Sequence, residues 1–134
     1  MHIERQRFHM RKLLLFLVFA ACVAPALARA QGGAASLEDD LTRLSEILGG
    51  LHYLRGVCGT NEAQAWRANM QALIEAEAPA GSPRRARMVA GFNRGYRGFQ
   101  QTYRTCTAAA ELAIRRHLDE GLKISREVTA RYSN

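Results

Sequence analysis

The chain has 134 residues and carries 19 Lys and Arg against 12 Asp and Glu, a formal net charge of +7. Residues 1–30 hold five of these bases and one acid, so residues 31–134 hold 14 bases against 11 acids, a net charge of +3. So small a charge removes most of the compositional support for nucleic-acid binding, and no nucleic acid is expected as a partner. Residues 31–134 are long enough for one modest domain with its own core.

Residues 1–30 have the layout of a secretory signal peptide. Basic residues are followed by an unbroken apolar run, Leu13 to Ala24, and Ala28-Arg29-Ala30 fits the small-x-small pattern of a cleavage site. We therefore expect export to the periplasm or the medium, with the mature chain beginning at Gln31. Because the apolar run is short and Pro25 follows it, we interpret it as part of the signal peptide rather than as a transmembrane helix. We expect no transmembrane helix in the mature chain.

Two alternatives remain open for this leader. Phe19-Ala20-Ala21-Cys22 loosely resembles a lipobox, which would make Cys22 the lipidated first residue of an anchored lipoprotein. The other alternative is that residues 1–30 stay uncleaved and act as an N-terminal anchor. If residues 1–30 are a cleaved signal peptide, residues 31–35 form a short disordered segment at the start of the mature chain. Residues 36–134 then form the folded domain.

Two cysteines, Cys58 and Cys106, follow the leader. An exported chain with two cysteines most simply pairs them in a disulfide. The alternative is two buried free thiols. Their spacing is unlike the Cys-x-x-Cys of redox exchange, so we expect a structural bond.

Three helices are predicted up to Cys106. The first begins at Ser36, a residue suited to capping, and carries a leucine stripe through Cys58. Gly49-Gly50 interrupts it, so either the helix kinks or a bulky neighbouring ring packs on the bare backbone. The second spans about 62–78, and the third starts with the Ser82 cap and Pro83.

The third helix separates its side chains into three stripes when they are projected at 100° per residue. Aromatic side chains form the first stripe and arginines the opposite one. Glycines 91, 95 and 98 form a flank that lets another backbone or ring approach. The predicted core comprises Leu41, Leu44, Leu48, Leu51, Trp66, Phe92, Tyr96, Phe99 and Tyr103.

The segment after Thr107 is also helical in composition. No glycine or proline at residues 105–107 forces a reversal, so the third helix either continues through Thr107 or turns back as a fourth helix. Leucines on more than one side fit a packed fourth helix or a protruding helix that forms a homodimer. The compact bundle is favoured, because it buries these leucines within one chain. The predicted fold is thus all-α, a small antiparallel bundle of three to four helices with one disulfide.

Several short segments resemble a known family. They are Leu51-His52-Tyr53-Leu54-Arg55, Trp66-Arg67 with Met70, Phe92-Asn93-Arg94-Gly95-Tyr96-Arg97, and Tyr103 with Cys106-Thr107. Together they resemble an uncharacterised alphaproteobacterial family of small secreted helical proteins, known only as a domain of unknown function. The resemblance covers roughly residues 41–132 and implies export and the two-cysteine pattern. It implies no activity, ligand or catalytic residue.

No motif of a known chemistry is present, which favours a non-enzymatic protein without a cofactor. His52 and His117 lack further ligands at metal-binding spacing, so no metal is predicted and both are interpreted as structural. The candidate binding surface is the arginine stripe of the third helix: Arg94, Arg97, Arg104 and Gln101. An arginine stripe can be an ordinary solvated face, but guanidinium groups also bind carboxylate or phosphate.

Two functions are consistent with these features. The first is an exported envelope or periplasmic interaction module, whose arginine face binds an anionic envelope component or an acidic protein. The second is a periplasmic carrier that holds a small ligand in an apolar pocket between helices.

Overall fold

The computed structural model describes the backbone of residues 24–59 and 61–132, and the side chains of residues 33–59 and 61–131. The basic part of the predicted signal peptide, nearly all of its apolar part and Cys22 lie outside the described residues. The chain divides into two compact units, residues 1–36 and 37–134. In the described residues no helix is both long enough and apolar enough to span a membrane.

The first described helix, α2, runs from Ala24 to Val57. It therefore begins before Ser36, where the sequence predicted a helix start, and it includes residues 31–35, which were predicted to be disordered. Residues 24–35 are rich in alanine, the best helix former, so the helix extends backward without a cap at Ser36. The glycine pair at residues 49–50 lies within the same helix and does not end it.

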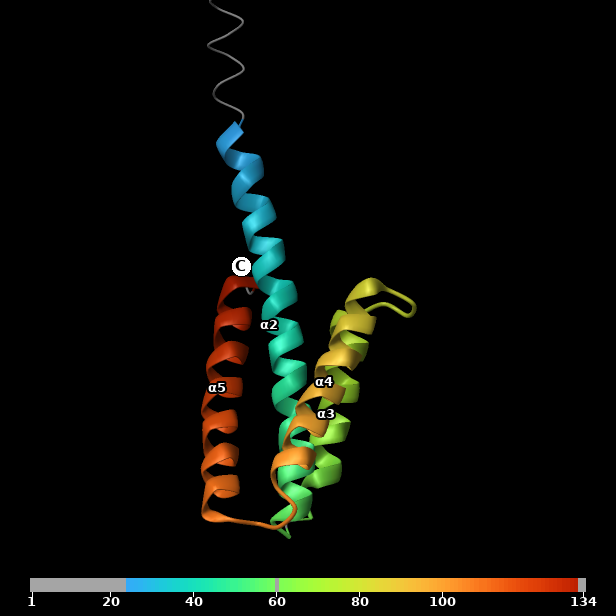
Figure 1. Ribbon diagram of the computed structural model, residues 1–134. Helices are drawn as coiled ribbons and strands as arrows, with labels where there is room; N and C mark the ends of the chain where they lie inside the picture. Colours follow the sequence, from blue (N-terminus) through green and yellow to red (C-terminus); the bar gives the residue numbers. More distant parts are fainter. Residues whose placement is uncertain (1–23, 60, 133–134) are drawn as a thin grey trace, which may run out of the picture. The chain divides into compact units, whose positions relative to one another are not determined.

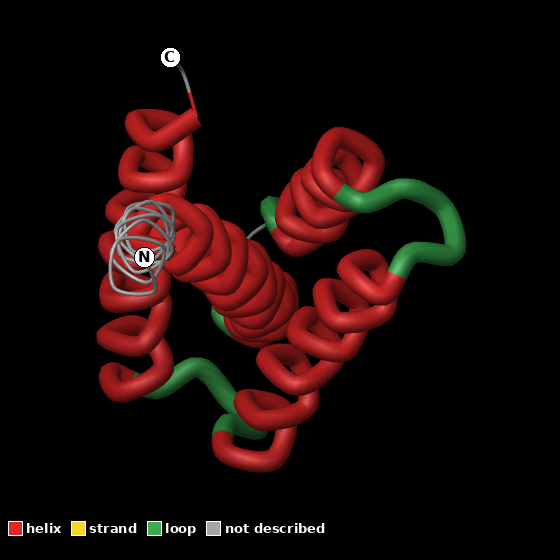
Figure 2. The backbone as a smooth tube through the Cα atoms, turned by 90° about the horizontal axis from the view of Figure 1, so that it is seen from above, coloured by secondary structure: helices red, strands yellow, loops and turns green. Residues whose placement is uncertain are grey.

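Three further helices complete the second unit: α3 (Ala63–Glu77), α4 (Pro83–Thr102) and α5 (Ala108–Tyr132). Successive helices run in opposite directions, and residues 37–57 of α2 lie between α5 on one side and the α3–α4 pair on the other (Figures 1 and 2). The described residues hold no strand. The predicted all-α bundle is confirmed, with four described helices.

The turn between α4 and α5 decides between the two alternatives for the C-terminal segment. α4 ends at Thr102, and α5 folds back as a separate helix. Thr107 marks the start of α5, because its hydroxyl accepts a hydrogen bond from the Ala110 backbone N–H at 3.1 Å. The Tyr53 hydroxyl donates to the Tyr103 carbonyl, which fixes the turn to α2.

The predicted disulfide is confirmed. Cys58, just after α2, is bonded to Cys106, just before α5, with an S–S distance of 2.04 Å. The bond closes a loop with a sequence separation of 48. It therefore ties the end of α2 to the α4–α5 turn.

The core is built mainly from aliphatic side chains in two clusters. Leu41, Leu48 and Met88 belong to one cluster, and Leu51 and Leu54 belong to the other. The remaining residues predicted as core are only half-buried: Leu44, Trp66, Phe92, Tyr96, Phe99 and Tyr103. The rings of α4 therefore cover the aliphatic core and keep part of their surface exposed.

Glycines allow α2 and α4 to pack backbone against backbone. A β-carbon at Gly91 would lie 2.8 Å from the Thr42 carbonyl oxygen, and one at Gly95 would overlap the Glu46 carbonyl. A β-carbon at Gly49 would overlap the Phe92 carbonyl in the same way, and one at Gly50 would lie 2.9 Å from the Phe99 ring. The prediction of a close approach is correct for Gly91 and Gly95 and wrong for Gly98, where a β-carbon would meet nothing within 4 Å.

Candidate ligand-binding surface

The predicted arginine face divides between a helix and a turn. Arg94, Arg97 and Gln101 are exposed on α4, at spacings of three and four residues that place them on one side of the helix. Arg104 is also exposed, but it lies beyond the end of α4, in the connection to α5. The sequence prediction of one continuous helical stripe is therefore wrong for Arg104.

Several other arginines of the unit, among them Arg43, Arg84 and Arg87, are held by carboxylates. Arg84 and Arg87 both bind Glu38, each with an N–O distance of 2.6 Å. The hydrogen bond from Arg84 is the main cause of a lowered pKa of the Glu38 carboxyl, and the one from Arg87 lowers it further. Arg43 donates two hydrogen bonds to Glu120 at 2.7 and 2.8 Å, which lowers the pKa of the Glu120 carboxyl. These pairs join α2 to α4 and to α5.

Arg94, Arg97 and Arg104 form no ion pair and no hydrogen bond within the part of the chain that the structure describes. Their guanidinium groups are therefore available to an external anion. Each offers a planar set of N–H donors that matches a carboxylate or a phosphate.

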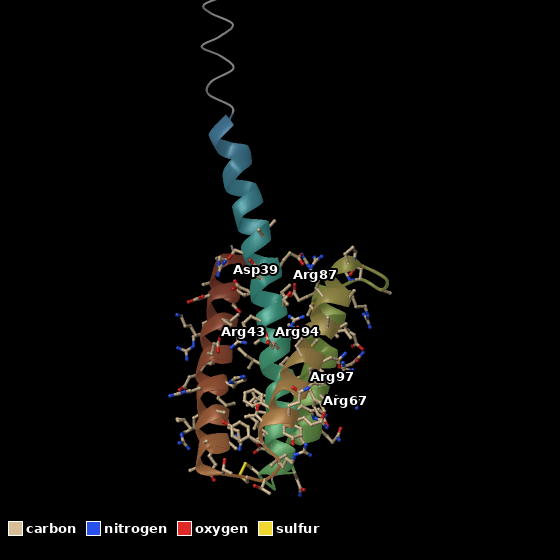
Figure 3. All side chains as sticks on the ribbon, viewed as in Figure 1. Asp39, Arg43, Arg67, Arg87, Arg94 and Arg97 are labelled. Atoms are coloured by element: carbon tan, nitrogen blue, oxygen red, sulfur yellow. A yellow bond between two sulfur atoms is a disulfide. The ribbon has the colours of Figure 1, made fainter. Side chains whose placement is uncertain are left out.

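A surface groove of about 390 Å³ runs between α3 and α4. We call it the α3–α4 groove; its lining residues are His52, Arg67, Met70, Gln71, Ile74, Val89, Phe92, Asn93 and Tyr96. The lining contains one formal cation and no carboxylate. Figure 3 shows Arg67, on α3, and Arg97, on α4, in the half of the unit that holds the disulfide.

His52 contributes an oriented imidazole to this groove. Its Nδ1 lies 2.7 Å from the Ala63 carbonyl oxygen, which can only accept, so Nδ1 carries a proton and, in the neutral ring, Nε2 is an acceptor. The ring is stacked on Phe92 at a centroid distance of 5.8 Å and is tilted against Tyr96 at 5.5 Å. His52 is thus a structural residue, as predicted from the sequence, that also presents an acceptor.

Some polar groups at the α3–α4 groove already form hydrogen bonds with described residues, and others do not. Gln71 donates to Glu75 at 2.7 Å. Arg67, the Asn93 amide and the Tyr96 hydroxyl form no hydrogen bond or ion pair with other described residues. The groove therefore combines an apolar aromatic floor with donors that no described side chain uses.

A second and more apolar groove, of about 460 Å³, lies over α2 between α3 and α5. We call it the α3–α5 groove. Leu44, Leu48 and Leu51 of α2 line it, together with Trp66 and Leu73 of α3 and Leu118 and Leu122 of α5. Leu122 is 53% exposed, and the buried Trp66 Nε1 has no hydrogen-bond acceptor among the described residues.

His117 borders the α3–α5 groove and packs edge-on against Phe99, with ring centroids 4.9 Å apart. Burial lowers the pKa of His117, and the nearby Arg43 guanidinium lowers it further. Glu120 and Glu46 oppose this shift. No group of three or more His, Cys, Asp or Glu side chains suited to a metal ion occurs among the described residues.

Sequence reasoning missed the α3–α4 groove. Projection of α4 alone placed Phe92 and Tyr96 in the core, whereas they are only half-buried and line the same groove as Arg67 of the neighbouring helix. One signal was present: Arg67 and Gln71 lie one turn apart on the same side as Met70 and Ile74. That mixed stripe of polar and apolar residues is typical of a groove edge rather than of a solvated face.

The fold and these surfaces define a small disulfide-linked helical bundle with the two grooves described above and an arginine face that no described carboxylate pairs. Residues 36–132 match the family described as protein of unknown function (DUF2385). Because the match covers most of the chain, the protein belongs to this family. Neither the curated proteins nor the solved structures contain a significant match.

Proposed function

We propose that the protein is an exported, non-enzymatic interaction module of the cell envelope that binds an anionic partner through Arg94, Arg97, Arg104 and Gln101. One observation carries the proposal: these three arginines follow one another along α4 and the turn after it, exposed and without an ion pair among the described residues, whereas Arg43, Arg84 and Arg87 hold carboxylates. A cationic face that no internal anion neutralises has its charges available to a partner.

The rigidity of α4 supports this function. Gly91 and Gly95 bring the helix directly against the backbone of α2, so Arg94 and Arg97 project from a closely packed element. A fixed array of guanidinium groups loses less entropy on binding than the same groups on a loop would lose. The partner would be an anionic envelope component or an acidic protein.

The test reverses the charge of the face. The triple variant Arg94→Glu, Arg97→Glu, Arg104→Glu is compared with a control that reverses three exposed arginines of α5: Arg115→Glu, Arg116→Glu, Arg126→Glu. Cross-linking in intact cells and co-sedimentation with peptidoglycan and with anionic lipid vesicles measure partner binding. The proposal predicts lost binding for the α4 variant alone, with an unchanged circular dichroism spectrum. Equal binding by both variants would contradict it.

Export is proposed from the leader pattern of residues 1–30 and from the disulfide, a bond that persists in oxidising compartments. Protein recovered from the periplasmic fraction is expected to begin at Gln31. A lipid-modified Cys22 at the N-terminus would replace this proposal with an anchored lipoprotein. A mature protein that begins at Met1 in the cytoplasmic fraction would reject export.

A second candidate function is a carrier of a small apolar ligand, and the α3–α5 groove favours it. The groove is lined by leucines from α2, α3 and α5, and Leu122 remains largely exposed. Native mass spectrometry of the freshly purified protein is expected to show a co-purified ligand, which is lost in Leu122→Glu.

The leucines of α5 in this groove, Leu118 and Leu122, could instead form the interface of a homodimer. Light scattering separates the two uses. A dimeric mass that Leu122→Glu converts to a monomer favours the dimer, and an empty monomer rejects both.

A further inference from the structure

We propose that the α3–α4 groove is a binding site for a small carboxylate with a flat apolar body, a function separate from partner binding by the arginine face of α4. The inference comes from the lining of the groove: an aromatic floor, one unpaired guanidinium and no carboxylate. Its volume of about 390 Å³ lies within the range of small-molecule sites.

The floor of the groove fixes the shape of the ligand body. His52 is stacked on Phe92 with an interplanar angle of 28°, and Tyr96 packs against the same imidazole. Met70 and Ile74 are buried beside these rings, while Val89 is 42% exposed. An aromatic ring laid on this surface would cover apolar side chains that water now contacts, which is a favourable exchange.

Arg67 determines the charge of the ligand. The guanidinium is exposed on α3 and forms no ion pair within the described residues. Glu75, the acidic residue next to the groove, is engaged by Gln71 instead. A carboxylate fits the planar fork of one guanidinium in a two-point contact, so one acidic group per ligand satisfies the site.

Two further groups select among aromatic carboxylates. In the neutral imidazole of His52, Nε2 is an acceptor, because Nδ1 donates to the Ala63 carbonyl. The Asn93 amide is an unused donor and acceptor at the α4 edge. A ligand with a ring hydroxyl can donate to His52 while its carboxylate binds Arg67. An analogue whose carboxylate is replaced by a neutral group lacks the charged contact to Arg67.

The probe is 4-hydroxyphenylacetate, which carries a carboxylate, a ring and a hydroxyl. Its neutral analogue 4-hydroxyphenylacetamide and the hydroxyl-free phenylacetate serve as matched ligands. Binding is measured with the purified protein by amide chemical shifts in NMR titrations. The expected result is saturable binding with shifts confined to α3, α4 and the region of His52. We expect the amide to bind at least about tenfold more weakly and phenylacetate to fall between the two.

Variants assign the contacts. Arg67→Gln is expected to lower the affinity for 4-hydroxyphenylacetate by about tenfold. Asn93→Asp is expected to lower it by at least as much, because the new carboxylate repels the ligand's carboxylate. Arg126→Gln, an exposed arginine on α5, is the control and is expected to leave affinity unchanged. Arg94→Glu is expected to retain most of the affinity, which separates this site from the arginine face of α4.

Three results would overturn the proposal. The first is an absence of saturable binding by either carboxylate probe. The second is equal affinity for the acid and its amide, because the guanidinium would then have no role. The third is an equal loss of affinity in Arg67→Gln and Arg126→Gln, which would indicate unspecific attraction by net charge.

Discussion

Gly95 of α4 lies directly against the backbone carbonyl of Glu46 in α2, so close that a β-carbon at this position would overlap the carbonyl oxygen. Gly49 and Phe92 form a reciprocal contact nearby, with the glycine on α2. Each helix thus contributes a bare backbone segment to the other. This arrangement explains why a glycine pair persists within α2 despite its low helix propensity.

The first prediction concerns this contact. Gly95→Ala is expected to lower the free energy of unfolding by about 3 kcal/mol or more, because neither backbone can move aside without separating the helices. Gly98→Ala is the matched control, since a β-carbon there meets nothing within 4 Å. It is expected to stabilise the protein by about 0.5 to 1 kcal/mol through helix propensity. Urea unfolding of both variants measures the difference, and equal effects would contradict the proposed contact.

Periodicity and capping residues in the sequence predict the helices of this fold but not all of their ends. Ser82 is the N-cap of α4, and its side chain accepts from the Arg85 backbone N–H at 3.2 Å. The end of α4 was not predictable from helix breakers, because no glycine or proline occurs at residues 105–107. Tertiary constraints end it instead: the Cys106 disulfide and the Tyr53 contact to Tyr103. The Thr107 cap was the one local signal for the new helix.

The candidate site was predicted only in part. Projection of α4 predicts that Arg94 and Arg97 point outward, and both are exposed, because helical geometry alone determines which side they occupy. It cannot show that Arg67 of another helix lines one groove with Phe92 and Tyr96, because this depends on how α3 packs beside α4. Grooves between helices depend on such packing and are not visible in the pattern of one helix.

The second prediction concerns the disulfide. Replacement of Cys58 and Cys106 by alanine is expected to lower the free energy of unfolding by about 4 kcal/mol, the loop entropy for a sequence separation of 48. Urea unfolding of the wild type with and without reductant, beside the double variant, measures this cost. The reductant is expected to have no effect on the double variant. A wild-type midpoint that is unchanged on reduction would show that the bond adds no stability.

The third prediction concerns Trp66, which packs against both hydrophobic clusters. Its Nε1 is buried without an acceptor among the described residues, so the indole N–H opposes the favourable packing of the ring. Trp66→Phe is therefore expected to cost less than about 1 kcal/mol, because it removes the buried donor while keeping an aromatic ring. Trp66→Ala is expected to cost about 2 to 3 kcal/mol, since the ring is only half-buried. Equal losses in chemical unfolding would show that the N–H is satisfied in solution.

The fourth prediction concerns His117 and pH. Burial, aided by Arg43, lowers the pKa of His117 in the folded protein. The unfolded chain therefore takes up a proton at a higher pH than the folded protein does. The stability contributed by neutral His117 is fully present above the ordinary histidine pKa of about 6.5 and is lost as the pH falls below it.

Thermal unfolding between about pH 7 and pH 5 measures this loss, in a window that lies above the carboxyl pKa of Glu38 and Glu120. His117→Gln is expected to flatten the pH dependence, because glutamine does not titrate and retains a polar group beside Phe99. Gln100→Asn, a substitution at an exposed, non-ionisable residue of α4, is the control and is expected to keep the wild-type slope. If His117→Gln keeps the wild-type slope as well, the group that takes up the proton is not His117.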